Sequence, residues 1–360
     1  MKQYIITVDG GTTNTRCILW DENRRRIAQE NRPVGVRNTA IDGNNRKLKQ
    51  AVKECLDALV EKNGLGYGDI HRIIASGMIT SDVGIVVVPH LTAPAGLEEL
   101  AAATVAIELP EICPVPIYFI PGIKNSDGPF SFENIETMDI MRGEEVESIA
   151  VMEQFKSGRP LLLVLPGSHN KFVSVDAEGK MTGCLTSISG ELLASITNDT
   201  IIAKSVNREF VSPESYDREW VQKGYETATR AGLGRACFTA RILMLFYNND
   251  PKKLANYILG ATIAGDMQAV RNSTALKVDG DTLAVVGGKE PLRTAVADVL
   301  KYDGYFREVE TFCPGGGYPA LGQRRLHRGP GNRNFIRGNE MGKKVIITDY
   351  QYENIDAERR

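Results

Sequence analysis

Four features are missing from this sequence, and each absence argues against a class of protein. No run of about 18 apolar residues occurs, so no membrane-spanning helix is predicted. The first three residues lead straight into an apolar strand, without the apolar core or small-residue cleavage site of a signal peptide. The formal net charge is only -2, which gives no general attraction to nucleic acid or to an anionic membrane. The six cysteines include no C-x-x-C pair, which argues against a zinc site or a disulfide framework.

These absences indicate a cytoplasmic protein with reduced thiols and a small molecule as its partner. With 42% apolar and 24% charged residues, the composition is that of an ordinary globular protein. Its 360 residues exceed what one hydrophobic core usually serves. We therefore expect two domains. A homodimer is compatible with the sequence.

The most informative positive feature is a repeated hairpin. Residues 4–21 and 161–176 each run from an apolar strand through a turn of glycine and hydroxyl residues to a basic residue, a second apolar strand and an aspartate. With one residue of slack in the turn, Asn14 aligns with Asn170. Glycine lets the backbone N–H groups of such a turn come close to an anion. Two turns that face each other would hold a polyphosphate between two domains, as in a phosphotransferase or an ATPase with a closing cleft.

The first turn, DGGTTNTR over residues 9–16, carries the first candidate site residues. A carboxylate at the end of a buried strand needs a partner, and Asp9 is suited to hold water on an ATP-bound magnesium ion. Arg16 would add positive charge. The predicted phosphate donors of this turn are Gly11, Thr12, Thr13 and Asn14. The alternative is an ordinary hairpin turn, since Gly-Thr turns are common.

The second turn, PGSHNK over residues 166–171, gains its meaning from the match to the first. We expect Gly167, Ser168 and Lys171 to bind phosphate. His169 is as suited to orienting the turn through a backbone hydrogen bond as to contacting substrate. Further along, an apolar strand leads into Gly287 and Gly288, which would let an adenine or ribose lie against the backbone. A tight strand-to-helix junction would need the same glycines.

The segment MRGEE, residues 141–145, supplies the candidate base, with Arg142 and Gly143 before a predicted helix whose first turn holds Glu144 and Glu145. Phosphoryl transfer to an alcohol needs a carboxylate that accepts the hydroxyl proton. We assign this role to Glu144, with Asp139 in reserve and Arg142 as a further catalytic residue. The alternative is that Glu144 and Glu145 only complement the dipole at the helix N-terminus.

Taken together, these motifs resemble the phosphate-1, phosphate-2 and adenosine signatures of the superfamily of acetate and sugar kinases, heat-shock ATPases and actin. With SGMITSDVG (76–84), IPG (120–122) and SGELL (189–193), the chain resembles the 2-dehydro-3-deoxygalactonokinase family over about residues 3–326. The resemblance implies transfer of the ATP γ-phosphoryl group, with Mg²⁺, to the 6-hydroxyl of 2-keto-3-deoxy-D-galactonate. The product would then feed an aldolase in galactonate breakdown.

The resemblance also implies an α/β fold of two ribonuclease H-like domains, the actin-like ATPase fold, around an interdomain cleft. We expect a sugar-acid domain at 1–140, a nucleotide domain at 141–326 and an exposed or disordered basic tail at 327–360. The loop 76–84 and the segment 90–96 would line the sugar pocket, and Arg16, Arg37 or Arg142 would meet the substrate carboxylate. The predicted substrate-binding residues are Arg16, Met78, Arg142, His169 and Glu191.

Two positions depart from the family pattern. Gly10 stands where the family usually has an aromatic residue, and Phe172 stands where it has tryptophan. Both bear on the identity of the sugar acid more than on the reaction. Two other functions stay open: a kinase of another small hydroxy acid or sugar, such as pantothenate, on the same fold, and a non-enzymatic actin-like nucleotide switch.

Overall fold

The computed structural model describes residues 4–155 and 158–312, and this part of the chain forms two compact units. Unit 1 runs to Lys124 and includes Met141–Gln154, whereas unit 2 includes Asn125–Ile140 and the described residues between 155 and 312. This division differs from the single boundary at residue 140 expected from the sequence. The difference arises because residues 141–154 pack into the first unit. The tail expected at 327–360 lies outside the described residues.

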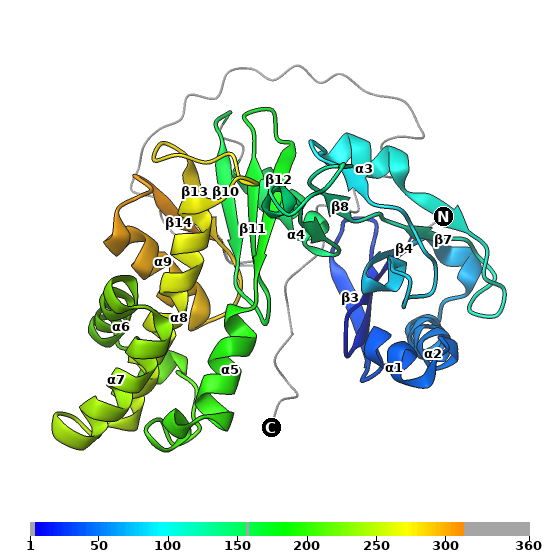
Figure 1. The fold of residues 1–360 in the computed structure, drawn as a ribbon. Coiled ribbons are helices and arrows are strands. Elements are labelled where there is room, and N and C mark those ends of the chain that lie inside the picture. Colours follow the sequence, from blue (N-terminus) through cyan, green and yellow to red (C-terminus); the bar gives the residue numbers. More distant parts are fainter. Residues whose placement is uncertain (1–3, 156–157, 313–360) are drawn as a thin grey trace. The chain divides into compact units, whose positions relative to one another are not determined.

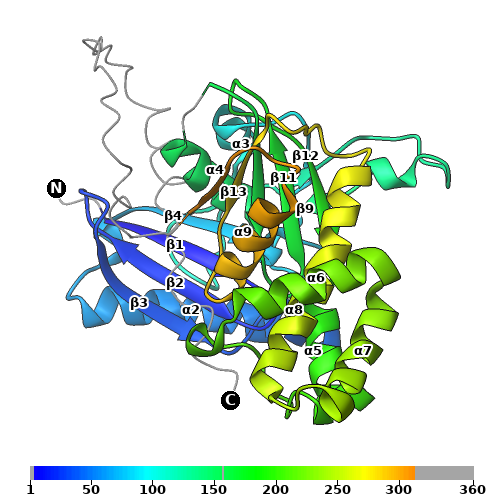
Figure 2. The ribbon, with the colours of Figure 1, turned by 90° about the vertical axis from the view of Figure 1, so that its left-hand side faces the viewer.

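Unit 1 is built on a six-stranded sheet in the order β3-β2-β1-β4-β7-β6 (Figures 1 and 2). Its first three strands form an antiparallel meander, β4 and β7 continue the sheet parallel to β1, and β6 is antiparallel to β7. The strands are β1 (Tyr4–Gly10), β2 (Thr15–Trp20), β3 (Arg26–Arg32), β4 (Ile70–Gly77), β6 (Val105–Ile107) and β7 (Ile117–Phe119). The short strands β5 (Leu91–Thr92) and β8 (Ile123–Lys124) pair in parallel, and β9 (Ile140–Met141) spans the boundary of the units.

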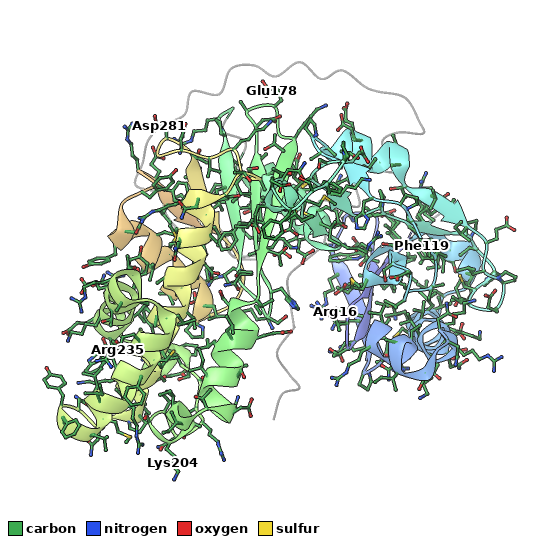
Figure 3. All side chains as sticks on the ribbon, viewed as in Figure 1. Arg16, Phe119, Glu178, Lys204, Arg235 and Asp281 are labelled. Atoms are coloured by element: carbon green, nitrogen blue, oxygen red, sulfur yellow. The ribbon has the colours of Figure 1, made fainter. Side chains whose placement is uncertain are left out.

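The helices of unit 1 differ in how much of their surface is buried. They are α1 (Val36–Asp42), α2 (Arg46–Lys62), α3 (Leu97–Ala103) and α4 (Glu144–Gln154), with short 3-10 turns η1 (Tyr67–Asp69) and η2 (Met78–Thr80). Helix α2 packs on β2 and β3 and buries leucines and valines spaced at helical intervals. Phe119, at the end of β7, is fully buried in this core (Figure 3).

Unit 2 contains a five-stranded sheet in the order β12-β11-β10-β13-β14. Its strands are β10 (Leu161–Leu165), β11 (Asn170–Val175), β12 (Met181–Ser187), β13 (Leu283–Val286) and β14 (Val309–Thr311). Its helices and turns are η3 (Ile135–Thr137), α5 (Ser189–Asp199), η4 (Ile201–Lys204), η5 (Pro213–Ser215), α6 (Arg218–Ala231), α7 (Leu233–Phe246), α8 (Pro251–Asn272) and α9 (Leu292–Asp303). Figure 1 shows α6, α8 and α9 packed beside one another, and their apolar faces share a core with β10, β11 and β13.

The two sheets have the same topology. In each sheet, three consecutive antiparallel strands are followed by two strands parallel to the first. If these five strands are numbered 1 to 5 along the chain, their order in the sheet is 3-2-1-4-5. The five are β10, β11, β12, β13 and β14 in unit 2, and β1, β2, β3, β4 and β7 in unit 1. This is the ribonuclease H-like arrangement, so the predicted fold class is confirmed. Among the helices of the described residues, none has both the length and the apolar character needed to cross a membrane.

Helices α6 and α8 approach so closely that glycine is required at their crossing. A Cβ atom added at Gly260 of α8 would lie 1.9 Å from the carbonyl oxygen of Val221, and one added at Gly224 of α6 would lie 1.8 Å from that of Tyr257. No real Cβ tolerates such a distance, because a backbone carbonyl cannot move aside as a flexible side chain can. The crossing therefore fixes α8, which lies in the core of unit 2.

We predict that Gly260→Ala destabilises the protein, because the added methyl group forces α6 and α8 apart. Overpacking of this kind costs about 1–3 kcal/mol, to be measured as a lower free energy of unfolding in chemical denaturation. Gly265→Ala is the matched control, since Gly265 lies on the exposed side of the same helix with open space around it. Alanine is the better helix former there, so equal losses in the two variants would contradict this account of the crossing.

Candidate functional site

The first turn, between β1 and β2, is closed by its own backbone. The N–H of Gly11 donates to the carbonyl of Asn14 at 2.9 Å, and the side chains of residues 12–14 are exposed. The start of helix α1 is hydrogen-bonded to the turn, because the N–H groups of Val36 and Arg37 donate to the carbonyls of Gly11 and Thr12. Within the described residues, no acceptor is in hydrogen-bonding range of the N–H groups of residues 12 and 13. These exposed donors are available to an anion.

The second turn, between β10 and β11, has the same plan. Helix α5 supports it, since the N–H of Glu191 donates to the carbonyl of Ser168 at 3.1 Å. The N–H groups of Ser168 and His169 likewise have no acceptor in the part of the chain that the structure describes, and both residues are exposed. The predicted substrate residues His169 and Glu191 are brought together, with 3.3 Å between Nε2 and Oε1. Glu178, in the turn between β11 and β12, marks the opposite end of the sheet from α5 (Figure 3).

Glycines hold each turn between a helix and the end of a parallel strand. A Cβ at Gly35, before α1, would lie 2.5 Å from the carbonyl oxygen of Gly11, and a Cβ at Gly190 of α5 would lie 2.0 Å from that of Gly167. Only glycine permits this seating of a turn on a helix. The repeat thus extends from the hairpin to the helix that follows it.

A second pair of glycines continues the repeat at the other side of each turn. Gly77 ends β4 and Gly288 follows β13, and both have a φ of +84°, which disfavours side chains. Gly77 packs against Gly10 and Asp9, whereas Gly288 packs against Pro166. The structure therefore places the predicted adenosine residues Gly287 and Gly288 directly beside the second turn.

In unit 1, the N-terminus of α4 lies beside the carboxyl end of β1. A Cβ added at Gly143 would lie 3.4 Å from the Cα of Gly77, and one added at Gly77 would lie 3.2 Å from Oδ1 of Asp9. Asp9 also faces Arg16 across the hairpin, with 3.9 Å between the carboxylate and the guanidinium. The predicted metal residue and the predicted base, Glu144, thus belong to one end of the same unit.

The first turn of α4 contains three glutamates, and the first two, Glu144 and Glu145, differ in their burial. Glu144 is half-buried, and its Oε2 accepts the backbone N–H of Arg142 at 3.0 Å. Glu145 is fully buried: its Oε2 accepts the N–H of Gly143 at 2.7 Å, and its Oε1 has no hydrogen-bond partner among the described residues. Burial, with the charge of Glu144 second, raises the pKa of Glu145 to about 8.

Glu147 is a candidate site residue that the sequence reasoning missed. Burial raises its pKa well above the usual range, and the negative charges of Glu144 and Asp9 raise it further. It lies three residues after Glu144 and therefore on the same side of the helix. The spacing of three residues from Glu144 is the feature of the sequence that could have identified Glu147 as a candidate. Repulsion within this group of carboxylates favours the binding of a proton or of a cation.

Arg142 is engaged within unit 1. Its guanidinium donates to the carbonyls of Thr80 at 2.7 Å and Val88 at 3.0 Å, and it also contacts Thr80 Oγ1 and the ring of His90. Burial lowers the pKa of Arg142, and burial together with the charge of Arg142 lowers that of His90 to about 4, so the imidazole is neutral. These contacts hold the entry to α4 against the loop after β4.

Lys171 and Asp139, predicted for phosphate and for base, belong to one network in unit 2. The ammonium of Lys171 is buried and donates to the carbonyl of Ile140 at 2.8 Å and to Thr186 Oγ1. The carboxylate of Asp139 accepts the N–H of Thr186 at 2.6 Å and its hydroxyl at 2.8 Å. Both side chains thus fasten the segment 125–140 to the sheet of unit 2.

Met78 opens η2 and is half-buried, in the loop expected to line a sugar pocket. The next residue, Ile79, explains one departure from the family pattern. A Cβ at Gly10 would lie 2.4 Å from the Cβ of Ile79, so the isoleucine fills the space beside β1. This chain therefore requires glycine at position 10.

The donors of unit 1 suit a magnesium ion that arrives with a nucleotide. Among the described residues, no group of three or more His, Cys, Asp or Glu side chains is arranged to hold a metal ion. Mg²⁺ commonly keeps several waters and takes only one or two protein carboxylates when phosphates supply the rest. The half-buried carboxylate of Asp9 fits such a role.

Comparison with known proteins identifies the family. The family model of 2-keto-3-deoxy-galactonokinase matches residues 9–310, which include both turns and α4. The chain belongs to this family. It is accordingly a phosphotransferase of the sugar-acid kinase type that uses a nucleotide, and the family predicted from the sequence motifs is confirmed.

Two relatives of this kinase family show how far the similarity reaches. The 2-dehydro-3-deoxygalactonokinase of Escherichia coli strain K12 is 22% identical over 275 residues, which cover 76% of this chain and 83% of the relative. The crystal structure of a putative 2-dehydro-3-deoxygalactonokinase from Sinorhizobium meliloti superimposes with a TM-score of 0.61 at 23% identity, covering 86% of this chain and 93% of that one. The latter similarity supports the kinase fold.

The buried carboxyl of Glu145 predicts a pH-dependent stability. Because folding raises its pKa from 4.5 to about 8, the native protein binds this proton more tightly than the unfolded chain, and stability is lost as pH rises through that interval. Glu145→Gln removes this loss. Its melting temperature relative to the wild type should therefore rise between about pH 5 and pH 9 in calorimetry, as the linkage requires.

Val146→Ala is the control for this measurement, since Val146 is buried in the same helix and neither valine nor alanine carries a titratable group. Its difference from the wild type should stay nearly constant with pH. A pH-independent difference for Glu145→Gln would show that its carboxyl ionises normally in the folded protein.

Proposed function

We propose that this protein transfers the γ-phosphoryl group of ATP to the 6-hydroxyl of 2-dehydro-3-deoxy-D-galactonate, with Mg²⁺, in the cytoplasm. The observation that carries the proposal is the placement of Glu144, at the start of α4, beside the carboxyl end of β1 where Asp9 lies. The name of the Escherichia coli relative supports this substrate. The exposed N–H donors of the two turns support a polyphosphate as the second substrate.

For the nucleotide, we assign the phosphate contacts chiefly to backbone amides. The first turn offers the N–H groups of residues 12 and 13, and the second offers those of Ser168 and His169. Lys171 contributes to the fold of unit 2 rather than to these contacts, because its ammonium already donates to protein acceptors. Gly287 and Gly288, beside the second turn, would receive the adenosine. Asp9 would hold the hydrated magnesium ion, which would neutralise charge on the phosphates.

For proton transfer, we assign Glu144 in preference to Asp139. Asp139 accepts two hydrogen bonds from Thr186, so its carboxylate is already used to hold β12. Glu144 accepts one backbone hydrogen bond through Oε2 and is half-buried, which leaves Oε1 for a substrate hydroxyl. In the reaction, Glu144 takes the proton of the 6-hydroxyl, the freed oxygen forms a bond to the γ-phosphorus, and ADP leaves.

For the substrate carboxylate, we favour Arg16 or Arg37 over Arg142. The Arg142 guanidinium is bound to two backbone carbonyls, so it cannot present a free fork to a planar anion. Arg37 is exposed in the first turn of α1, beside Thr12, and Arg16 lies next to Asp9. Met78 and the segment 90–96 would then line the remainder of the sugar site.

The proposed reaction predicts ATP consumption that depends strictly on a sugar acid. In a coupled assay of ADP release over a panel of 2-keto-3-deoxy sugar acids, the D-galactonate derivative should give the highest kcat/KM. Chelation of Mg²⁺ should abolish turnover. Pantothenate and simple sugars serve as controls. ADP release at the same rate without any acceptor would favour a nucleotide switch instead, and a preference for another acid would reassign the substrate.

The assignment of the base predicts that Glu144→Gln lowers kcat by roughly 10²–10⁴-fold, because the amide cannot accept the proton. The dissociation constant for ATP, measured by calorimetry, should stay near that of the wild type. Asp139→Asn is the matched control and should retain kcat within about tenfold, with a lower melting temperature. Near-normal kcat in Glu144→Gln would contradict the assignment of Glu144 as the base. A larger loss of kcat in Asp139→Asn would assign that role to Asp139.

A further inference from the structure

Helix α8 carries one carboxylate at a position that no motif in the sequence explains. Asp266 is only 3% exposed, in the middle of the core of unit 2. Its Oδ2 accepts the side-chain amide of Asn170 at 2.7 Å, and its Oδ1 accepts the hydroxyls of Ser187 and Ser189, each at 2.5 Å. All three partners are neutral. A buried carboxylate without hydrogen bonds would be costly, so these donors are what makes the position tolerable.

The three partners of Asp266 come from the three chain segments that shape the second turn. Asn170 begins β11, directly after the turn, and Ser187 ends β12 opposite it in the sheet register. Ser189 begins α5, one residue before the Gly190 that packs against Gly167. One carboxylate thus fastens both the turn and the helix that supports it.

Asp266 also selects the orientation of the Asn170 amide. The Oδ1 of Asn170 accepts the N–H of Gly167 at 2.9 Å, which closes the turn, while its Nδ2 donates to Asp266. If the amide were rotated by half a turn, its NH₂ group would face the N–H of Gly167, and two donors would meet. An acceptor at position 266 excludes that orientation, because the carboxylate would then face the amide oxygen instead of the NH₂ group.

We propose that Asp266 is the positioning residue of the second turn, and that it keeps the N–H groups of Ser168 and His169 directed for phosphate. Asp266 acts through Asn170 and touches no nucleotide itself. The proposal deepens the proposed function and rests on its assignment of this turn to ATP. It predicts that an exchange of acceptor for donor at position 266 weakens ATP binding without affecting the sugar-acid site.

The test compares Asp266→Asn with the wild type. In this variant only one end of side chain 266 can accept a hydrogen bond, so it no longer offers one acceptor to Asn170 and another to the two serines at the same time. The Asn170 amide is then no longer held in one orientation, and the turn loses a defined closure. We expect the dissociation constant for ATP to rise about 5- to 30-fold, as for the loss of a buried hydrogen bond, while KM for the sugar acid stays within about twofold. Hydrogen–deuterium exchange of a peptide covering 161–175 should accelerate.

Two further variants separate positioning from general stability. Asp298→Asn removes another buried carboxylate of unit 2, one on α9 that binds Tyr216 and Arg218. It should lower the melting temperature and leave ATP affinity unchanged. The double variant Asp266→Asn with Asn170→Asp restores the pairing in reverse, since a carboxylate at position 170 can accept both the N–H of Gly167 and the new amide. It should recover part of the lost affinity and slow the exchange again.

The outcomes distinguish this proposal from the function on which it rests. Wild-type protein that fails to bind ATP would overturn both. Wild-type binding with unchanged affinity and exchange in Asp266→Asn would overturn only the role of Asp266. Equal losses of ATP affinity in Asp266→Asn and Asp298→Asn, with no recovery in the double variant, would reduce Asp266 to a residue of the fold.

Discussion

The structure depends on the close seating of two hairpin turns on glycine. Each turn lies between the start of a helix and the end of a parallel strand, and at Gly35 and Gly190 a side chain would collide with the turn itself. Because the seating leaves no room for a Cβ, helix and turn pack directly against each other in each unit. The N–H groups at the tips of the turns are then exposed and fixed in direction. Fixed donors lose little freedom when an anion binds, which is what a phosphate site requires.

Around the first turn, the existing hydrogen bonds and the burial of each charged side chain determine which of them can interact with a ligand. Arg142 is committed to the loop after β4, so it stabilises the entry to α4 instead of offering its charge to a ligand. Glu145 is buried beneath the same helix start. Glu144 is only half-buried, so unlike the fully buried Glu145 it can reach a substrate, and Glu147 lies three residues further along the helix. The chemistry that we assign to Glu144 thus follows from how its neighbours are occupied.

Much of this architecture was predictable from the sequence, because strands, turns and helical periodicity are local properties. The repeated hairpin indicated the two units, and its motifs indicated the family and hence the sheet order. The roles of individual side chains were harder to predict. Lys171 follows the second turn as Arg16 follows the first, yet its ammonium is buried against Thr186. Nothing local to Lys171 shows that the segment 125–140 returns to cover it.

Asp266 illustrates the same limit more sharply. It lies 96 residues from Asn170 in the chain, within a helix whose pattern shows only a buried face. The contact between them depends on the packing of α8 in unit 2, which is set in part by Gly224 and Gly260. Sequence periodicity predicts that a helix buries one side but not which loop its polar residue meets. The division of the chain at 124, 140 and 154 has the same origin, because it depends on tertiary contacts of Asn125 and Arg142.

The difference in length between the two turns explains why only the second needs Asp266. The cross-strand pair Asp9 and Arg16 in the first hairpin corresponds to Leu165 and Lys171 in the second. Residues 10–15 lie between the first pair and residues 166–170 lie between the second, so the second turn is one residue shorter. The longer turn lets the N–H of Gly11 reach a backbone carbonyl, that of Asn14. In the shorter turn, Asn170 already belongs to β11 and pairs with β12, so its side chain closes the turn in place of its backbone. A side-chain amide can present either end, and a backbone carbonyl cannot. The shorter turn therefore requires a second residue to fix the amide, and the carboxylate of Asp266 meets that requirement.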